Sequence, residues 1–316
     1  MEDEKLNGVV GALSADAVAG AVYAAVRHCA THLRPDVLAA MQAARADETQ
    51  ARALSVLDCL LENAHIGQAD GVPICQDTGT CWVRLEIGEE LSVPGNILSR
   101  VNDAVARAYT DGRLRMSVLA DALLDRTNTG DNTPTFAEVA FRPGRGATLH
   151  VLLKGGGSDN ASRVVMLAPG AGWEGVRQVV LDCVHEKAAN ACPPLIVGVG
   201  VGATFDKVAG LAKHALLRKV GSPAASPQAA AREAELLAAV NATGIGPAAL
   251  GGSATALAVH LETAPCHIAA LPVAVNMGCS AMRSASIDLV SWETGLPVAN
   301  PTANLAYTAV EEGANR

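Results

Sequence analysis

The sequence predicts an α/β protein of the mixed α+β type, with sheets flanked by helices and a helical lobe at the N-terminus. Apolar residues recur at helical spacing through the first sixty positions, and the rest of the chain alternates between short apolar runs and helical patterns. Composition agrees: 50% of the 316 residues are apolar, but only 3% are aromatic. We therefore expect a core of Ala, Val, Leu and Ile, with many turns made by Gly and Pro.

The helical lobe is predicted at residues of about 10 to 65. Val26 and Leu33 belong to one apolar face with the i, i+3, i+4, i+7 spacing of a helix. Leu54 and Leu61 belong to a second face, opposite charged residues. Both patterns predict amphipathic helices that pack on a core.

After Pro73, strands and helices are predicted in alternation. The expected strands are residues 82–87, 148–153, 195–201 and 268–275, and the expected helices are residues 97–110, 173–189, 209–217 and 228–240. Residues 125–135 are polar without periodicity, which indicates a loop, and residues 221–227 read as a linker. We predict a single catalytic domain over residues 1–316, with its core at about 66–290.

Composition also excludes several classes of partner. A formal net charge of −8 argues against nucleic acid, which favours a basic face. The start Met-Glu-Asp-Glu-Lys lacks the basic and apolar segments of a secretory signal. No run of about 18 apolar residues is present to span a bilayer. These features predict a cytoplasmic protein with no membrane partner.

The eight cysteines are too sparse for a disulfide scaffold and are expected to be thiols. Cys29, Cys59 and Cys183 lie in helical patterns and are predicted to fill the core, because free cysteine is among the most buried residue types. Cys81 and Cys266 border predicted strands and are also expected to serve packing.

Cys75, Cys192 and Cys279 stand in turn-rich surroundings that contain Gly or Pro. A metal-binding thiolate must leave a regular element and point into a shared space, which such turns allow. Their spacing alone leaves a shared metal site open, because nothing resembles Cys-x-x-Cys.

Five segments resemble the α subunit, or N-terminal catalytic domain, of class I fumarate hydratases and of the related L(+)-tartrate dehydratases. They are Pro73-Ile-Cys-Gln-Asp-Thr-Gly79, Lys154-Gly-Gly-Gly-Ser158, Ala191-Cys-Pro-Pro-Leu-Ile-Val-Gly-Val-Gly-Val-Gly202, Gly244-Ile-Gly-Pro247 and Ala269-Ala-Leu-Pro-Val-Ala-Val-Asn-Met-Gly-Cys279. The order and spacing of these segments match, and the resemblance runs from about residue 10 to about residue 290.

The resemblance implies that Cys75, Cys192 and Cys279 hold a [4Fe–4S] cluster with one iron left for substrate. It implies that Gln76 and Asp77 contact substrate, with Asp77 as the acid/base. Such an open iron acts as a Lewis acid on a hydroxyl group, and a positioned base takes the proton next to a carboxylate.

Arg115, the pair Gly156 and Gly157, and His267 also match substrate-contacting positions of the family. The family further implies a separate β subunit in an α₂β₂ heterotetramer. The implied reaction is reversible hydration of a small dicarboxylate, foremost fumarate to (S)-malate, a step of the tricarboxylic acid cycle. L(+)-tartrate or mesaconate would be handled by the same mechanism.

Each residue also has a purely structural interpretation. Asp77 is a natural Asx-turn residue before Thr78-Gly79, the glycine run Gly155–Gly157 reads as a flexible loop, and a lone His267 as a core histidine. Arg115 and Lys154 can bind carboxylates or be surface charges. A non-catalytic cluster-binding or redox-sensing subunit, or a zinc-stabilised protein, are functional alternatives.

One motif argues for a nucleotide but is incomplete. Gly198-Val-Gly-Val-Gly202 follows a predicted strand, yet it does not complete Gly-x-Gly-x-x-Gly, and no acidic residue ends a second strand about 20 residues on. We do not expect nucleotide binding.

Overall fold

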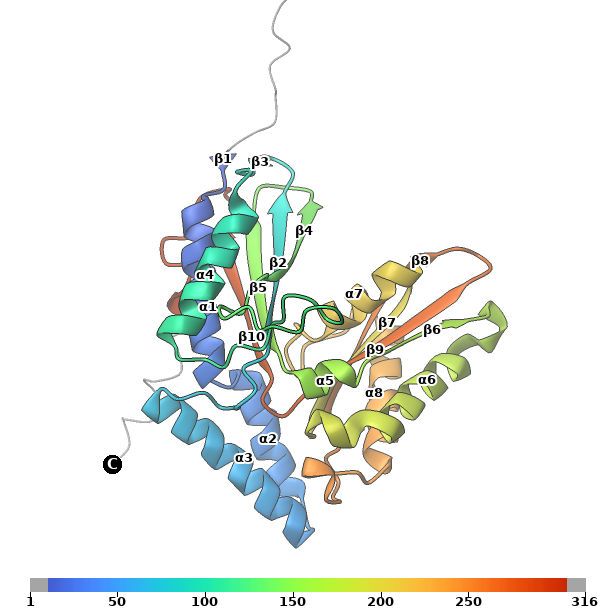
Figure 1. Cartoon of the computed structure of the whole chain (residues 1–316). Helices are drawn as coiled ribbons and strands as arrows, with labels where there is room; N and C mark the ends of the chain where they lie inside the picture. Colours follow the sequence, from blue (N-terminus) through green and yellow to red (C-terminus); the bar gives the residue numbers. More distant parts are fainter. Residues whose placement is uncertain (1–10, 306–316) are drawn as a thin grey trace, which may run out of the picture. The chain divides into compact units, whose positions relative to one another are not determined.

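The computed structural model describes residues 11–305, which form two compact units (Figure 1). Unit 1 contains residues 11–32, 75–154 and 283–305, and unit 2 contains residues 33–74 and 155–282. Each unit has its own four-stranded sheet. The predicted mixed class, with sheets flanked by helices, is therefore confirmed.

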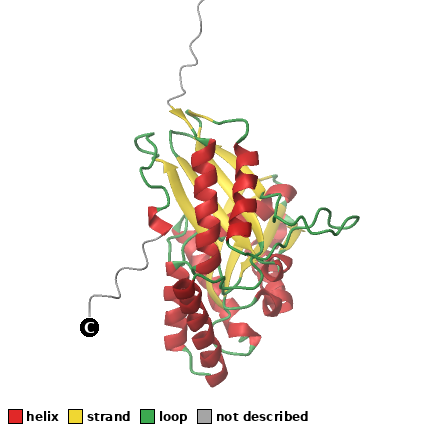
Figure 2. Ribbon diagram, turned by 60° about the vertical axis from the view of Figure 1, so that its left-hand side comes forward, coloured by secondary structure: helices red, strands yellow, loops and turns green. Residues whose placement is uncertain are grey.

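Unit 1 is built on a sheet with strand order β10-β5-β2-β4. The strands are β2 (Thr80–Gly88), β4 (Phe136–Arg142), β5 (Ala147–Lys154) and β10 (Arg283–Val290). β5 is antiparallel to both β2 and β10, whereas β4 runs parallel to β2. Figure 2 shows the helices α1 (Ala15–Thr31) and α4 (Ile97–Asp111) side by side over one face of this sheet. A short parallel pair, β1 (Gly11–Ala12) and β3 (Leu91–Ser92), completes the strands of this unit.

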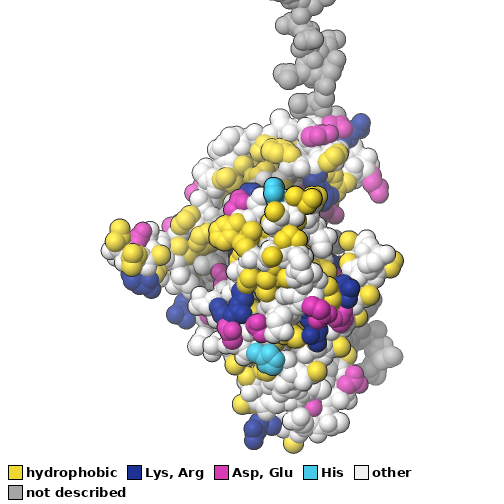
Figure 3. All heavy atoms as spheres, turned by 90° about the vertical axis from the view of Figure 1, so that its right-hand side faces the viewer, with side chains coloured by type: hydrophobic (Ala, Val, Ile, Leu, Met, Phe, Trp, Pro, Cys, Tyr) yellow, Lys and Arg dark blue, Asp and Glu magenta, His cyan; other side chains and the backbone are white. Residues whose placement is uncertain are grey.

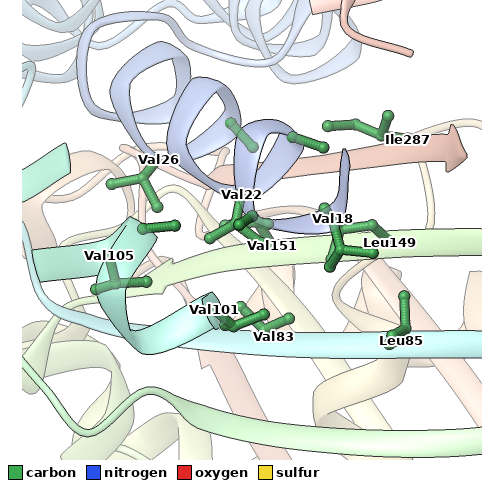
Figure 4. Close-up of a cluster of buried hydrophobic side chains, with 14 of the residues drawn as sticks. Val18, Val22, Val26, Val83, Leu85, Val101, Val105, Leu149, Val151 and Ile287 are labelled. Atoms are coloured by element: carbon green, nitrogen blue, oxygen red, sulfur yellow. The ribbon is translucent and has the colours of Figure 1, made fainter. Parts of the chain in front are cut away.

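The core of unit 1 lies between that face and the two helices (Figure 4). Val18, Val22 and Val26 follow one another at i, i+4 and i+8 on α1 and point at alternate residues of the strands, such as Val83 and Val151. Ser14 caps the start of α1 by accepting a hydrogen bond from the Ala17 N–H. Each fully buried Val or Leu contributes about 1.5–3 kcal/mol, so this layer is what stabilises the unit.

Unit 2 is built on a sheet with strand order β6-β9-β7-β8. The strands are β6 (Arg163–Leu167), β7 (Leu195–Ala203), β8 (Ala256–Cys266) and β9 (Leu271–Gly278). β9 is antiparallel to β6 and β7, and β8 is parallel to β7. The α-helices of the unit are α2 (Pro35–Asp47), α3 (Ala51–Asp70), α5 (Gly156–Asn160), α6 (Gly172–Lys187), α7 (Phe205–Ala215) and α8 (Pro227–Ala242).

The glycines of β7 are explained by helix packing. A Cβ at Gly198 would lie 2.1 Å from the Ala212 carbonyl oxygen, and one at Gly200 would lie 2.6 Å from the Val208 carbonyl oxygen. Both carbonyls belong to α7, so glycine lets this helix approach the strand closely. The run that superficially suggests a nucleotide loop is therefore a contact surface for a helix.

The helices predicted at residues 10–65 are present, but they are divided between the two units. α1 buries its valines against the sheet of unit 1. α2 and α3 belong to unit 2, where Val37, Met41 and Leu57 are buried. The division follows from which sheet each apolar face covers, a property that helical periodicity does not specify.

Two of the predicted core cysteines are exposed, and those two predictions are wrong. Cys59 follows the buried Leu57 by two positions, which places it about 200° around α3 and on its outer side. Cys266 ends the edge strand β8, where its thiol donates to the Ala270 carbonyl at 3.3 Å. Cys29, Cys81 and Cys183 are buried, as expected.

Among residues 11–305, no helix is both long enough and apolar enough to cross a membrane. Figure 3 shows acidic and basic side chains interspersed on the displayed face rather than gathered by sign.

Candidate functional site

The segment Cys75–Gly79 leads directly into β2 of unit 1 and contains three of the predicted site residues. Cys75 and Asp77 are half-buried, and Gln76 is exposed. The Asp77 Oδ1 accepts the Gly79 N–H at 3.0 Å, which is the Asx turn that the sequence suggests, and Gly79 has a φ of 78°. This structural role is compatible with a catalytic one, because the turn fixes the position of the Asp77 carboxyl group.

The backbone of this segment is held by buried polar side chains that sequence reasoning missed. The Tyr109 hydroxyl is 3.2 Å from the Thr78 carbonyl oxygen and 2.9 Å from that of Gly79, to which Asn132 Nδ2 also donates at 3.2 Å. Arg283 Nη1 donates to the Asp77 carbonyl at 2.7 Å. All three donor side chains are at most 1% exposed. No short motif links these residues, so sequence alone offers no signal for the set.

Arg115 lies beside the same segment. The Thr78 hydroxyl donates to the Arg115 carbonyl oxygen at 2.8 Å, and Thr78 is itself buried. The Arg115 residue is exposed. Unit 1 therefore gathers Gln76, Asp77 and Arg115 at one end of β2.

Lys154 ends β5 of unit 1, next to the start of β2, and only 3% of it is exposed. Its carbonyl oxygen lies 3.5 Å from the Thr80 hydroxyl. Because Lys154 is buried, it is not a solvated surface charge.

Unit 2 brings Cys192 and Cys279 onto neighbouring loops. Cys192 follows a short 3₁₀ turn, η2 (Ala188–Ala191), and precedes β7, whereas Cys279 follows β9. These two strands are antiparallel, with Ile196 opposite Gly278, and the Ser280 N–H donates to the Cys192 carbonyl at 3.0 Å. Cys192 is exposed and Cys279 is half-buried, so neither is a core residue.

Cys192 has a left-handed backbone conformation, with φ 56° and ψ 70°. A non-glycine residue there costs about 1–3 kcal/mol and occurs disproportionately at functional sites. The conformation turns the chain out of η2 immediately before β7.

The glycine run packs against the loop that contains Cys192. Gly156 and Gly157 begin α5, and a Cβ at Gly157 would lie 2.8 Å from the Asn190 carbonyl oxygen. Asn276 of β9 ties the same helix to the sheet, because its Nδ2 lies 3.5 Å from Asp159 Oδ1, and it also donates at 2.6 Å to Ser162 Oγ just after the helix. Close packing therefore explains the glycine at position 157. The residue that it packs against, Asn190, is two positions before the predicted ligand Cys192.

His267 lies at the other end of the sheet. It stands in the turn between β8 and β9, it is exposed, and its Nδ1 accepts the Ala269 N–H at 3.1 Å. β9 begins just after this turn and ends before Cys279, a length of roughly 25 Å at 3.3 Å per residue. Within unit 2 the structure does not bring His267 to the cysteine pair.

Five of the eight thiols illustrate two groups that differ in their burial and therefore in their chemistry. Burial raises the pKa of Cys81 and Cys183, which disfavours the thiolate that binds metals. Cys75, Cys192 and Cys279 are not fully buried, and they lie in loops that adjoin strands. This donor set fits a thiolate-bound metal group better than the buried set does.

The three candidate thiols are divided between the units, with Cys75 in unit 1 and the other two in unit 2. Within the described part of the chain, no group of three or more His, Cys, Asp or Glu side chains is arranged to hold a metal ion.

Comparison with known proteins points in one direction. The model of the family described as "Fumarate hydratase (Fumerase)" matches residues 19–288. The chain is 36% identical over 265 residues to the "Putative L(+)-tartrate dehydratase subunit alpha" of Methanocaldococcus jannaschii, covering 82% of this chain and 93% of that one. It is 31% identical over 261 residues to the "L(+)-tartrate dehydratase subunit alpha" of Escherichia coli K12, covering 81% and 86%.

Proposed function

The chain belongs to the fumarate hydratase (Fumerase) family and is a hydro-lyase, and from this premise we propose that it is the α subunit of a [4Fe–4S]-dependent enzyme that hydrates a small dicarboxylate. The observation that best supports the proposal is the pairing of Cys192 with Cys279. The hydrogen bond from the Ser280 N–H to the Cys192 carbonyl holds the two loops together. Cys75 would be the third ligand.

The cluster, when bound, supplies a Lewis-acidic iron with an open position for the hydroxyl group of the substrate. The chain's own residues supply the rest. Gln76 and Arg115 lie next to Asp77 in unit 1 and would bind the substrate, Arg115 through a bidentate contact with a carboxylate. Gly156 and Gly157 would let backbone N–H groups approach the same anion. His267 enters no step of this scheme.

Asp77 would move the proton. Dehydration removes a proton from the carbon next to a carboxylate and a hydroxyl group from its neighbour, and the Asp77 carboxylate would accept that proton. Hydration reverses both steps, so the same group would return the proton to carbon. The Asx turn and the buried donors behind residues 77–79 hold this carboxyl group in one place.

Fumarate is the proposed substrate, with (S)-malate as product. L(+)-tartrate is the second candidate, and a specific observation favours it: the relatives of 31–36% identity are named as tartrate dehydratase subunits. Those names also specify subunit alpha, which supports a β subunit as partner, proposed here as α₂β₂.

The test is to produce the chain anaerobically with its β subunit, reconstitute it with iron and sulfide, and count iron. Fumarate, L(+)-tartrate and mesaconate are then assayed in parallel. We expect about four irons per chain, lost in Cys192→Ser but kept in Cys59→Ser, which changes an exposed cysteine outside the site. A protein that stays colourless and iron-free would refute the cluster, and turnover of tartrate without fumarate would reassign the substrate.

A further inference from the structure

Arg283 is a charged side chain placed inside the core of unit 1. It opens β10 opposite Leu153 of β5, and strand alternation puts it on the same face as Ala285 and Ile287, which belong to the core. It is 1% exposed and heads the fully buried side chains by volume. Arginine is almost never fully buried without a partner, because removing its charge from water is costly.

Among residues 11–305, the Arg283 guanidinium makes one hydrogen bond, and that bond goes to the segment that contains Asp77. Nη1 donates to the Asp77 carbonyl oxygen at 2.7 Å, a short bond from a charged donor. Nε is buried without a hydrogen-bond partner, and the structure gives Arg283 no salt bridge among residues 11–305. A methionine of similar volume would fill the space at a lower desolvation cost. Packing therefore does not account for an arginine here.

The bond to Asp77 belongs to a continuous set. The carbonyls of three consecutive residues, Asp77, Thr78 and Gly79, are each met by a buried side chain from a distant part of the chain. Burial raises the pKa of Tyr109 far above its usual value, so its hydroxyl stays protonated as a donor. Tyr109 and Asn132 serve residues 78 and 79, and Arg283 donates to the carbonyl of Asp77 itself.

We propose that Arg283 is a positioning residue for catalysis: its guanidinium holds the Asp77 backbone so that the carboxyl group meets the reacting carbon. The proposal rests on the proposed role of Asp77 as the acid/base. A displacement of about 1 Å in such a group costs on the order of 100-fold in rate. Arg283 follows the predicted ligand Cys279 by four residues, so one short segment would contribute to both cluster binding and proton transfer.

The test compares Arg283→Met and Arg283→Lys with Arg84→Met in the reconstituted complex with the β subunit. Arg84 is a suitable control because it lies on β2 of the same sheet, is also largely buried, and pairs with Glu86 and Glu138 on β2 and β4. Two quantities are measured on the same samples: kcat and KM for fumarate, and hydrogen exchange of the peptide covering residues 75–80.

We expect Arg283→Met to lower kcat about 100-fold with KM changed by less than about threefold. Exchange in residues 75–80 should accelerate by about tenfold, since a buried carbonyl has lost its donor. Arg283→Lys, which keeps a charged donor but not the planar geometry, should fall between these limits and keeps the test decisive if the methionine variant fails to fold. Arg84→Met should leave both quantities within about twofold.

A kcat within about threefold of wild type in both Arg283 variants would overturn the proposal, as would unchanged exchange in residues 75–80. A wild-type complex that turns over no dicarboxylate while the exchange effect persists would instead remove the proposed function, and with it the catalytic part of this inference.

Discussion

The two groups of candidate site residues are held in place in different ways. In unit 1, the segment Cys75–Gly79 depends on side chains: Tyr109, Asn132 and Arg283 come from remote positions to meet three backbone carbonyls. In unit 2, Cys192 and Cys279 depend on backbone pairing, because β7 and β9 are antiparallel neighbours and a main-chain hydrogen bond joins the two loops.

This difference teaches where each group of candidate residues is vulnerable. Backbone pairing tolerates most changes of side chain, so the cysteine pair should be disturbed chiefly by residues that alter packing under the loops. A loop held by buried side-chain donors is less tolerant of substitution, because each lost donor leaves a buried carbonyl without a hydrogen bond. Point substitutions can therefore disturb one group of candidate residues without disturbing the other.

The largest effect should come from Asp77, the proposed acid/base. Asp77→Asn keeps the Asx turn, because asparagine offers the same Oδ1 acceptor to the Gly79 N–H, and thus changes chemistry without changing the loop. We expect turnover to fall by about 10²–10⁴-fold with iron content unchanged. Steady-state assays beside an exposed control, Asp125→Asn, would measure this. Equal activity of the two variants would exclude Asp77 as the acid/base.

Low pH should reduce the stability of unit 2 through His260, a residue outside the loops that contain Cys192 and Cys279. His260 of β8 is 3% exposed, and within residues 11–305 neither ring nitrogen has a hydrogen-bond partner. Burial, followed by the charge of Arg218, lowers its pKa to about 4. The unfolded chain binds the proton near pH 6.5, whereas the native protein does not until about pH 4. Stability is therefore fully present above the unfolded pKa and is lost as pH falls, by about 3 kcal/mol in total.

Urea titrations between pH 7 and pH 4 would measure this loss. His260→Leu should make the profile shallower without flattening it, because burial also lowers the pKa of His28 in α1 to about 4. A variant whose free energy of unfolding follows the wild-type pH dependence would show that another group is responsible.

Packing under the cysteine loops can be tested at Gly157. Gly157→Ala would place a Cβ 2.8 Å from the Asn190 carbonyl, and such overpacking costs about 1–3 kcal/mol. The free energy of unfolding should fall by that amount, and iron retention should fall with it. Gly170→Ala is the matched control, because within the described part of the chain the added Cβ would meet no atom within 4 Å beyond its immediate chain neighbours. If both variants behave alike, the contact between α5 and the Asn190 loop is unimportant.

The smallest effect should come from a single hydroxyl. Tyr109→Phe removes the donor to the Thr78 and Gly79 carbonyls, and an unsatisfied buried acceptor costs about 1–3 kcal/mol. Tyr23→Phe removes an exposed hydroxyl that contacts Asp111, and should cost less than about 0.5 kcal/mol. Thermal unfolding of the pair would give the difference. A Tyr109→Phe protein as stable as Tyr23→Phe would show that the donor set is not required.

The candidate site illustrates the limits of sequence interpretation. Cys75, Cys192 and Cys279 stand in turns, and their surroundings separate them from Cys29 and Cys183, whose helical patterns predict burial. Tyr109, Asn132 and Arg283 carry no such signal. Each acquires its role only because folding places its donor beside a particular carbonyl.

The strands make the same point. The central strands of the two sheets, β2, β5, β7 and β9, are predicted from the sequence, while the edge strands, β4, β6, β8 and β10, are missed. Central strands are apolar runs, because both neighbours and a packed face bury them. An edge strand such as β4 leaves Phe136 and Phe141 exposed among charged residues, and its pattern is irregular.

The sequence by itself thus determines the mixed class, the central strands and every α-helix except the short α5, because local periodicity encodes them. The three candidate ligands are predictions that rest on the family resemblance. The tertiary structure decides the edge strands, the division into two units, the burial of Arg283 and the separation of His267 from Cys279. These properties depend on which distant segments pair and which face each element covers, and no local pattern contains that information.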